Sequence, residues 1–415
     1  MNAEKDTIKP RGVFELNSLF CLNRALSAFI VRLFFCLPVL IGYGQPLFAA
    51  EIDQTKLAEI GTAAEAAIAR GDCPGAVVVV VHDDTVAYRK AFGNRAVKPD
   101  AVAMTADTVF DMASLTKPVA TGTSVMLLIQ QGKLKPDDLV SKHWPGFAAN
   151  GKDKVTVEHL LLHTSGLTAD NAIADYADGK AKALERIAAL KLEAPAGTRF
   201  KYSDVGFIVL GELVERVGGM PVDAFAKKHV FDPLKMTDTG FTPTDALKKR
   251  VAPTGLRDGK IILGEVHDPR AFKMGGAAGH AGLFSTADDM ARYCRMLLRG
   301  GELDGVRVLD AKTVKLFTEA HAVPLPPNKD GTAAPGTRSF GWDVDTSYSA
   351  PRGDRFKKGE GYGHTGFTGT SAWLDPGTKT AVIVLTNRVH PDDKGNVTRL
   401  RREVATIVAA AVGKK

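Results

Sequence analysis

Ser114 and Lys117 have the residue types and the spacing for nucleophilic chemistry. They stand three residues apart at the start of an apolar helical stretch, FDMASLTKPVATGTSVMLLIQQGK (110–133). Residues at i and i+3 share a helix face, and Pro118 is tolerated only in the first turn, so the helix should begin near Ser114. A serine hydroxyl needs an adjacent base, and a lysine serves if burial or nearby charge lowers its pKa. Alone, the pair is better explained as a helix cap beside a solvated lysine, because many helices show this spacing by chance.

Three further segments change the interpretation. They read HLLLHTSGL (159–167), FKYSDVGFIVLG (200–211) and GYGHTGFTG (361–369). With the opening PGAVVVVV (74–81), they resemble the serine β-lactamase and penicillin-binding protein superfamily. The resemblance is to its class C-like branch, and within it to DD-carboxypeptidases of the penicillin-binding protein 4B type and to β-lactamase-related esterases. It covers nearly all of 55–412, with the motifs in the family's order.

The resemblance implies a role for each matching residue. Ser114 would be the acylated nucleophile, Lys117 the general base, and Tyr202 the group that passes a proton to the leaving group. A phenol beside ammonium groups can have a depressed pKa, which suits that task. The oxyanion hole would be the backbone N–H groups of Ser114 and Phe367, and Gly366 would let the edge strand approach the acyl group. No cofactor is implied.

Two positions depart from the pattern of β-lactamases. Asp204 stands where the family more often has Asn, and His364-Thr365-Gly366 stands where β-lactamases have Lys-Thr-Gly. Histidine is only partly charged at neutral pH, and an aspartate adds negative charge near the substrate. Both changes argue against an efficient β-lactamase. We therefore expect a serine hydrolase that cleaves an amide or ester, of the DD-carboxypeptidase or esterase type. The alternatives are a weak class C-type β-lactamase and a non-catalytic penicillin-binding or structural relative.

The elements that must position these residues come from both ends of the chain. Periodicity and turn signals predict a helix at 55–70, hairpins at 75–94 and 370–387, and a helix at 396–412. Between the hairpins, 110–299 reads as mostly helical, and SFGWDV is a candidate strand in a loop-rich connection. We expect an α+β, β-lactamase/DD-peptidase-like fold. Its antiparallel sheet of about five strands would be built from both chain ends (51–109 and 300–415) and flanked by the terminal helices. A mainly helical second lobe (110–299) would leave a cleft at the boundary.

The first 50 residues read as a targeting segment. Residues 33–44 are twelve mostly apolar positions that follow two arginines and precede a small-residue end, Ala49-Ala50. A membrane span needs about 20 apolar residues, so a cleaved signal peptide fits better than an uncleaved N-terminal anchor. We expect an exported protein, periplasmic or extracellular, with anchoring to the inner membrane as the alternative.

Composition and charge limit the classes of partner and substrate that we expect for this chain. Of 415 residues, 45% are hydrophobic and 24% charged, which are ordinary globular values. Removing residues 1–50 takes away five cations and three anions, so the formal charge falls from +7 to +5. The basic runs lack interleaved aromatics, so no nucleic-acid partner is expected. The expected substrate is a small molecule or a peptidoglycan peptide, and peripheral contact with a membrane or cell wall is compatible with this. The oligomeric state is left open.

Other polar groups have simpler structural interpretations. Two of the four cysteines, Cys73 and Cys294, follow the targeting segment. We expect both to be unpaired thiols. His163 is expected to be an internal hydrogen-bonding residue, and the glycine-rich 275–282 is expected to be a loop near the cleft. The His/Asp groups at 82–84, 267–268 and 390–393 lack metal-ligand spacing, so no metal site is expected and surface turns explain them better.

Overall fold

The computed structural model describes residues 52–326 and 335–413, and in it strands from both ends of this described part form one nine-stranded antiparallel sheet. Its strand order is β10-β11-β12-β13-β14-β15-β1-β2-β3. The strands are β1 (Gly75–His82), β2 (Thr85–Ala96), β3 (Val102–Ala103), β10 (His321–Pro324), β11 (Pro335–Arg338), β12 (Asp343–Asp345), β13 (Tyr362–Thr365), β14 (Ser371–Asp375) and β15 (Thr380–Thr386).

The predicted α+β class, the antiparallel sheet and both hairpins are confirmed, but the strand number was underestimated. The additional strands are short, two to four residues each, and lie at the two edges of the sheet. Such pieces are too short to show a period of two in the sequence. The candidate strand SFGWDV is also only partly a strand, because Ser339 and Trp342 exchange backbone hydrogen bonds in a tight turn before β12.

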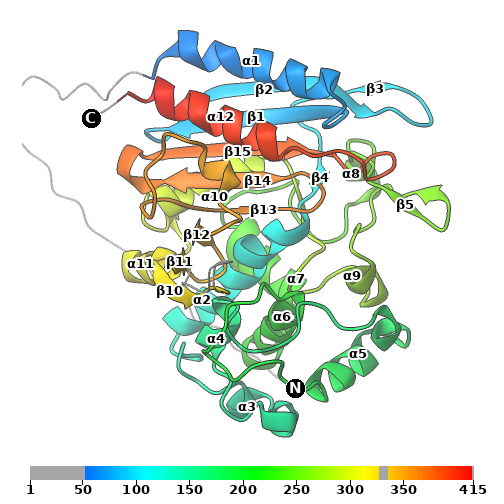
Figure 1. Ribbon diagram of the computed structural model, residues 1–415, viewed down its shortest axis with the longest axis vertical. Coiled ribbons are helices and arrows are strands. Elements are labelled where there is room, and N and C mark those ends of the chain that lie inside the picture. Colours follow the sequence, from blue (N-terminus) through cyan, green and yellow to red (C-terminus); the bar gives the residue numbers. More distant parts are fainter. Residues whose placement is uncertain (1–51, 327–334, 414–415) are drawn as a thin grey trace, which may run out of the picture. The chain divides into compact units, whose positions relative to one another are not determined.

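The central strand β1 explains why the sheet is covered on both faces. Its valines alternate between two cores, with Val77, Val79 and Val81 on one side and Val78 and Val80 on the other. A strand buried on both faces reads as a continuous apolar run. Helices α1 (Gln54–Ala69) and α12 (Thr398–Ala411) cover one face, as Figure 1 shows, and the two helices pack against each other.

The other face of the sheet carries α10 (Ala287–Leu298), which packs against β1 and β15. This helix falls within the range that the sequence assigned to the helical lobe. The remaining helices are α2 (Thr123–Gln130), α3 (Val140–His143), α4 (Val157–Leu161), α5 (Gly179–Ala188), α6 (Asp204–Gly218), α7 (Val222–Ala226), α8 (Asp245–Lys248), α9 (Pro269–Lys273) and α11 (Ala311–Thr318). Three small two-stranded sheets join β4 (Phe110–Asp111) to β7 (Phe284–Ser285), β5 (Leu256–Arg257) to β6 (Lys260–Ile261), and β8 (Glu302–Leu303) to β9 (Val306–Arg307).

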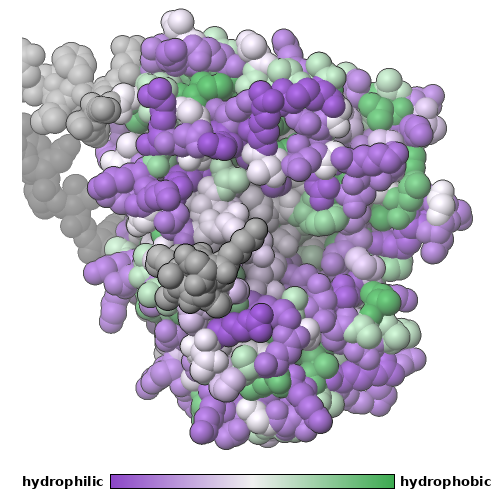
Figure 2. Space-filling view, in the orientation of Figure 1, coloured by the Kyte–Doolittle hydropathy of each residue, from purple (hydrophilic) through white to green (hydrophobic). Residues whose placement is uncertain are grey.

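The displayed face of the molecule is mostly hydrophilic (Figure 2). Figure 2 shows hydrophilic residues over most of the displayed face, with hydrophobic ones scattered among them. Among the helices that the structure describes, none is long and apolar enough to cross a bilayer. The expected targeting segment, 1–50, lies outside the described residues. Cys73 and Cys294 are buried free thiols, as predicted.

Candidate active site

Ser114 lies on a tight turn between β4 and the following helix. The turn is a 3-10 segment, Ala113–Leu115, followed by a π-helical segment, Lys117–Gly122, before α2 begins. Ala113 has a φ of 46°, a left-handed conformation that non-glycine residues rarely adopt. The Asp111 carboxylate holds this turn by accepting a hydrogen bond from the Ala113 N–H at 2.8 Å. The helix therefore begins near Ser114 as predicted, but through a strained turn rather than a regular α-helical one.

Lys117 is fully buried beside the serine. Its Nζ lies 3.1 Å from Ser114 Oγ, 3.0 Å from the backbone oxygen of His280 and 2.6 Å from Asp204 Oδ1. The alternative of a solvated lysine is thus excluded. Burial lowers the pKa of Lys117, but Asp204 and then Tyr202 raise it and outweigh burial, so the net shift is upward. The condition for a lysine base, a lowered pKa, is therefore not met in the free enzyme, because Asp204 stabilises the ammonium form.

Tyr202 stands between Lys117 and strand β13. Its ring centroid is 5.0 Å from Lys117 Nζ and its hydroxyl is 3.5 Å from His364 Nε2. His163 stacks on the phenol at 4.5 Å and accepts a hydrogen bond from Ser203 N–H, as expected for an internal histidine, although its Nε2 has no partner among the described residues. Burial raises the pKa of Tyr202 more than Lys117 lowers it. The depressed pKa that a phenol beside an ammonium group can have is therefore not found in the free enzyme.

Strand β13 brings the third motif to the same place. His364 is buried, and this burial, followed by the charge of Arg338, holds its pKa well below the usual value. The ring is therefore neutral at neutral pH rather than partly charged as expected. Thr365, next along the strand, lines the cavity at Ser114 together with His364.

Gly366 and Phe367 follow β13, which is an inner strand of the sheet and not the edge strand that was expected. A Cβ on Gly366 would lie 2.2 Å from Thr370 Oγ1 and 2.5 Å from Met112 O, so only glycine lets the strand end come this close to the turn that carries Ser114. Phe367 follows with 54% of its surface exposed. All eight residues assigned from the sequence thus gather around one site, while the oxyanion role of the Ser114 and Phe367 N–H groups stays a prediction.

Two cavities meet at Ser114. The first, of about 410 Å³, has in its lining Ser114, Tyr202, one carboxylate, Asp343, and three arginines, Arg338, Arg388 and Arg401, and we call it the arginine pocket. The second, of about 430 Å³, is lined by Ser114, Tyr202, Phe367 and four aspartates, Asp170, Asp204, Asp268 and Asp393, and we call it the aspartate pocket. Serine, tyrosine and Phe367 belong to both, so a molecule bound across the serine can enter both pockets.

Arg338 is a site residue that sequence reasoning missed. It is fully buried, and its Nη1 lies 3.1 Å from Asp343 Oδ1. Its Nε and Nη2 have no hydrogen-bond partner within the described part of the chain. A buried donor without a partner is costly, so a guanidinium that lines a cavity in this state is suited to an incoming anion. A lone arginine ahead of a short strand gives no signal in the sequence.

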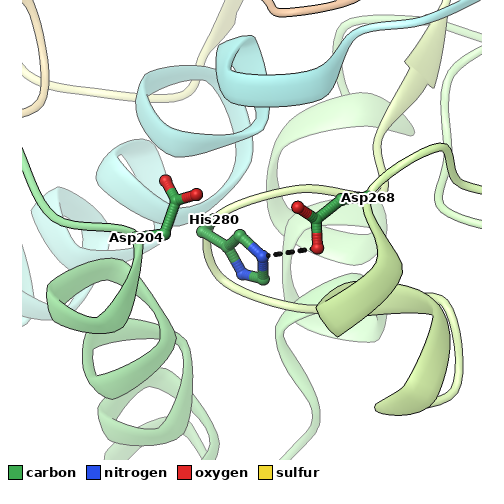
Figure 3. Close-up of side chains that lie close together, drawn as sticks. All are labelled: Asp204, Asp268 and His280. Atoms are coloured by element: carbon green, nitrogen blue, oxygen red, sulfur yellow. Dashed lines mark hydrogen bonds and ion pairs between the residues drawn. The ribbon is translucent and has the colours of Figure 1, made fainter. Parts of the chain in front are cut away.

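The glycine-rich loop, 275–282, supplies part of the wall of the aspartate pocket. His280 lies on it as predicted, near the cleft, and its Nε2 is 3.0 Å from Asp268 Oδ1 (Figure 3). Burial would raise the pKa of Asp268, but His280 lowers it further, so the net shift is downward. The expectation of a plain surface turn at 267–268 is wrong for Asp268, which belongs to the pocket wall.

Asp204, Asp268 and His280 also form a group that could bind a cation. Each offers a ligand atom, and these atoms lie within 4.8 Å of one another. The ammonium of Lys117 is already 2.6 Å from Asp204. The chain's own lysine thus provides a cation at this group, and a metal ion would have to compete with it.

Comparisons with known proteins agree with this geometry. The family model described as Beta-lactamase matches residues 60–406. A protein of Escherichia coli O157:H7 named "Putative D-alanyl-D-alanine carboxypeptidase" is 35% identical over 76% of this chain and 79% of its own length. The "N-acetylmuramyl-L-alanine amidase" of Bacillus subtilis (strain 168) is 34% identical over 84% of this chain and 86% of its own. A penicillin-binding protein homologue from Caulobacter crescentus shares the fold, with a TM-score of 0.69 and 22% identity over 87% of this chain and 98% of its own.

Proposed function

The chain belongs to the beta-lactamase family, and on that premise we propose that it is a serine hydrolase that forms an acyl-enzyme on Ser114. Its preferred substrate is an amide whose nitrogen belongs to an amino acid with a free carboxylate. The observation that carries this proposal is the contact of 3.1 Å between Lys117 Nζ and Ser114 Oγ beside a cavity lined by arginines.

The acylation step needs a neutral amine at Lys117. In the free enzyme Lys117 and Asp204 form an ion pair, and a bound substrate that excludes water makes the charged pair less favourable. Proton transfer across the 2.6 Å contact leaves a neutral amine and a neutral carboxyl group. The amine then takes the Ser114 proton while Oγ bonds to the carbonyl carbon. As the C–N bond breaks, Tyr202 donates its hydroxyl proton to the leaving nitrogen and regains a proton from the Lys117 ammonium. Water then adds to the acyl carbon, the bond to Oγ breaks, and Oγ takes up the proton that the water gives up as the acid leaves.

The arginine pocket supports an acidic leaving group. Arg338 brings two unpartnered N–H donors, and no ion pair is found for Arg401 among the described residues. Neutral His364 supplies no cation, so these arginines take the place of a charged lysine in the third motif. The names of both relatives, a D-alanyl-D-alanine carboxypeptidase and an N-acetylmuramyl-L-alanine amidase, describe cleavage of an amide bond to alanine.

Export follows as part of the same proposal. Peptidoglycan-derived amides of this kind lie outside the cytoplasm, and the signal-like composition of residues 1–50 fits delivery there. An ester can be cleaved by the same acyl-enzyme, but it does not use the arginines unless it carries a carboxylate.

A side-by-side assay tests the proposal. We expect the wild-type enzyme to release alanine from a D-alanyl-D-alanine peptide or from N-acetylmuramoyl-L-alanine, and to turn over nitrocefin and a neutral p-nitrophenyl ester more slowly. Mass spectrometry should find the acyl adduct on Ser114. Ser114→Ala should abolish every activity, and retained turnover in that variant would overturn the mechanism.

A further inference from the structure

Asp111 is a buried carboxylate in β4, just ahead of the turn that carries Ser114. It lines neither the arginine pocket nor the aspartate pocket, so it is not placed to touch a bound substrate. Burial raises the pKa of Asp111 to about 6, which leaves the side chain ionised at neutral pH. An ionised carboxylate has two oxygens that only accept hydrogen bonds, so the donors around it indicate its role.

The first oxygen of Asp111 holds the nucleophile turn. Its Oδ1 accepts a hydrogen bond from the Ala113 N–H at 2.8 Å. Ala113 has a φ of 46°, and a strained residue of this kind persists only where its surroundings fix it. Because Ser114 is the next residue, the direction of its own N–H group depends on this bond.

The second oxygen of Asp111 holds the segment between β6 and α9. Its Oδ2 accepts a hydrogen bond from the His267 N–H at 2.6 Å. The ring of His267 stacks on Phe367, with 5.5 Å between the ring centroids and 26° between the ring planes. The same carboxylate thus supports, through one ring contact, the residue whose N–H is the second expected oxyanion donor.

The backbone of the nucleophile turn also binds the loop that follows β13. The Thr368 hydroxyl donates to the backbone oxygen of Asp111 at 2.7 Å, and the Thr370 hydroxyl donates to that of Met112 at 3.0 Å. Both threonines are buried. Thr368 directly follows Phe367, so the loop with the Phe367 N–H is fixed to the turn with the Ser114 N–H.

Two N–H donors stabilise an oxyanion only when both lie about 2.7–3.1 Å from the same oxygen. The expected donors, Ser114 and Phe367, belong to segments far apart in the chain, and Asp111 is bonded next to each of them. We propose that Asp111 is a positioning residue that sets the separation of these two N–H groups and so completes the oxyanion hole. This inference rests on the proposed function, because the oxyanion hole serves the acyl-enzyme chemistry of Ser114.

Asp111→Asn tests the proposal at constant side-chain size. Both carboxylate oxygens face N–H donors, so in either orientation the amide NH₂ opposes one of these donors and one hydrogen bond is lost. We expect kcat for release of alanine to fall by about 10–100-fold, with KM changed by less than about threefold. Phenylboronic acid, which forms a tetrahedral adduct with an oxygen in the oxyanion hole, should lose affinity by a similar factor.

Asp289→Asn is the matched control. Asp289 is also buried, its pKa is also raised to about 6 by burial, and it accepts from the Asp238 N–H at 2.9 Å and the Thr239 hydroxyl at 2.8 Å. It lines neither pocket. Thermal unfolding should show both variants to be less stable than the wild type, but only Asp111→Asn should lose kcat and boronate affinity. Equal activities of the two variants would overturn the proposal.

Thr368 gives a second test that leaves the Asp111 side chain in place. Thr368→Val removes the hydroxyl and should lower kcat and boronate affinity by about tenfold, while Thr368→Ser restores the hydroxyl and should recover most of the loss. If Asp111→Asn does not fold, this pair decides, and full activity in Thr368→Val would contradict the proposal. Failure of the proposed function has a different signature, because the wild type itself would then form no Ser114 adduct and release no alanine.

Discussion

Two fully buried cations flank the reaction site, and their surroundings are opposite. Lys117 has a partner on every side, namely Ser114 Oγ, the His280 carbonyl and the Asp204 carboxylate. Arg338 has Asp343 on one nitrogen, and its other two nitrogens have no partner within the described residues. Lys117 is thus held in place by the protein alone, and under the proposed function the substrate would supply the missing partners of Arg338.

This difference has a physical basis in the cost of burial. A buried charge is tolerated when it is paired and hydrogen-bonded, and the missing partners of an incompletely paired charge cost free energy until a ligand supplies them. Asp204 raises the pKa of Lys117, whereas burial lowers the pKa of Arg338 despite the opposing effect of Asp343. The first cation is thus suited to proton transfer within the protein and the second to recognition of an anion.

Removing the fully paired cation should have the largest effect. Lys117→Met removes the base next to Ser114, and we expect kcat/KM to fall by about 10²–10⁴-fold. Lys152→Met is a matched control, because Lys152 is also fully buried but donates to the carbonyls of Ala149 and Leu190 and lines neither pocket. Steady-state kinetics and thermal unfolding of both variants check this. An equal loss of activity in the two variants would show that Lys117 has only the structural role of a buried lysine and is not the base.

Removing the incompletely paired cation should have an intermediate effect. Arg338→Gln should raise KM for N-acetylmuramoyl-L-alanine by about 10–100-fold, since a hydrogen bond to a charged group contributes about 1.5–3 kcal/mol. The corresponding substrate with a terminal carboxamide should show a much smaller difference between wild type and variant. Equal losses on both substrates would mean that Arg338 stabilises the pocket and does not bind the carboxylate.

Changing Asp204, the partner of Lys117, should shift the pH dependence of kcat/KM more than it lowers the maximal rate. Asp204 raises the pKa of Lys117, so Asp204→Asn should lower that pKa and move the rising limb of kcat/KM to lower pH. An opposite charge at this distance shifts a pKa by about 1–3 units, which is the expected size of the movement. Asp343→Asn is the control, because Asp343 contacts Arg338 and not Lys117. A profile that stays in place in Asp204→Asn would contradict the role of the ion pair.

The sequence predicted the parts of the site that lie in local motifs. Ser114 and Lys117 are three residues apart on one turn, and 364–367 form a continuous strand end, so their types and order were enough to locate them. The antiparallel sheet followed from two hairpins with clear turn signals, at Asp83-Asp84 and at Pro376-Gly377.

The remaining features depend on contacts between distant segments. The raised pKa of Lys117 comes from Asp204, 87 residues along the chain, and no spacing rule predicts a contact of 2.6 Å between them. Arg338 and Asp268 acquire their roles only because the fold places them in the walls around Ser114. Motifs thus located the candidate reacting groups, and tertiary structure determines their charge states and the polarity of the two pockets.

The two ends of the described unit adjoin in the structure. The Asp53 N–H donates to the Ala411 carbonyl at 3.0 Å, and β1 pairs with β15 along its length. A short linker between these ends, with new termini opened in the exposed β5–β6 turn at Asp258–Gly259, would keep every strand pair of the nine-stranded sheet. The fold is therefore a candidate for circular permutation, in which the nucleophile moves from near the start of the folded unit to past its middle while its neighbours in space stay the same.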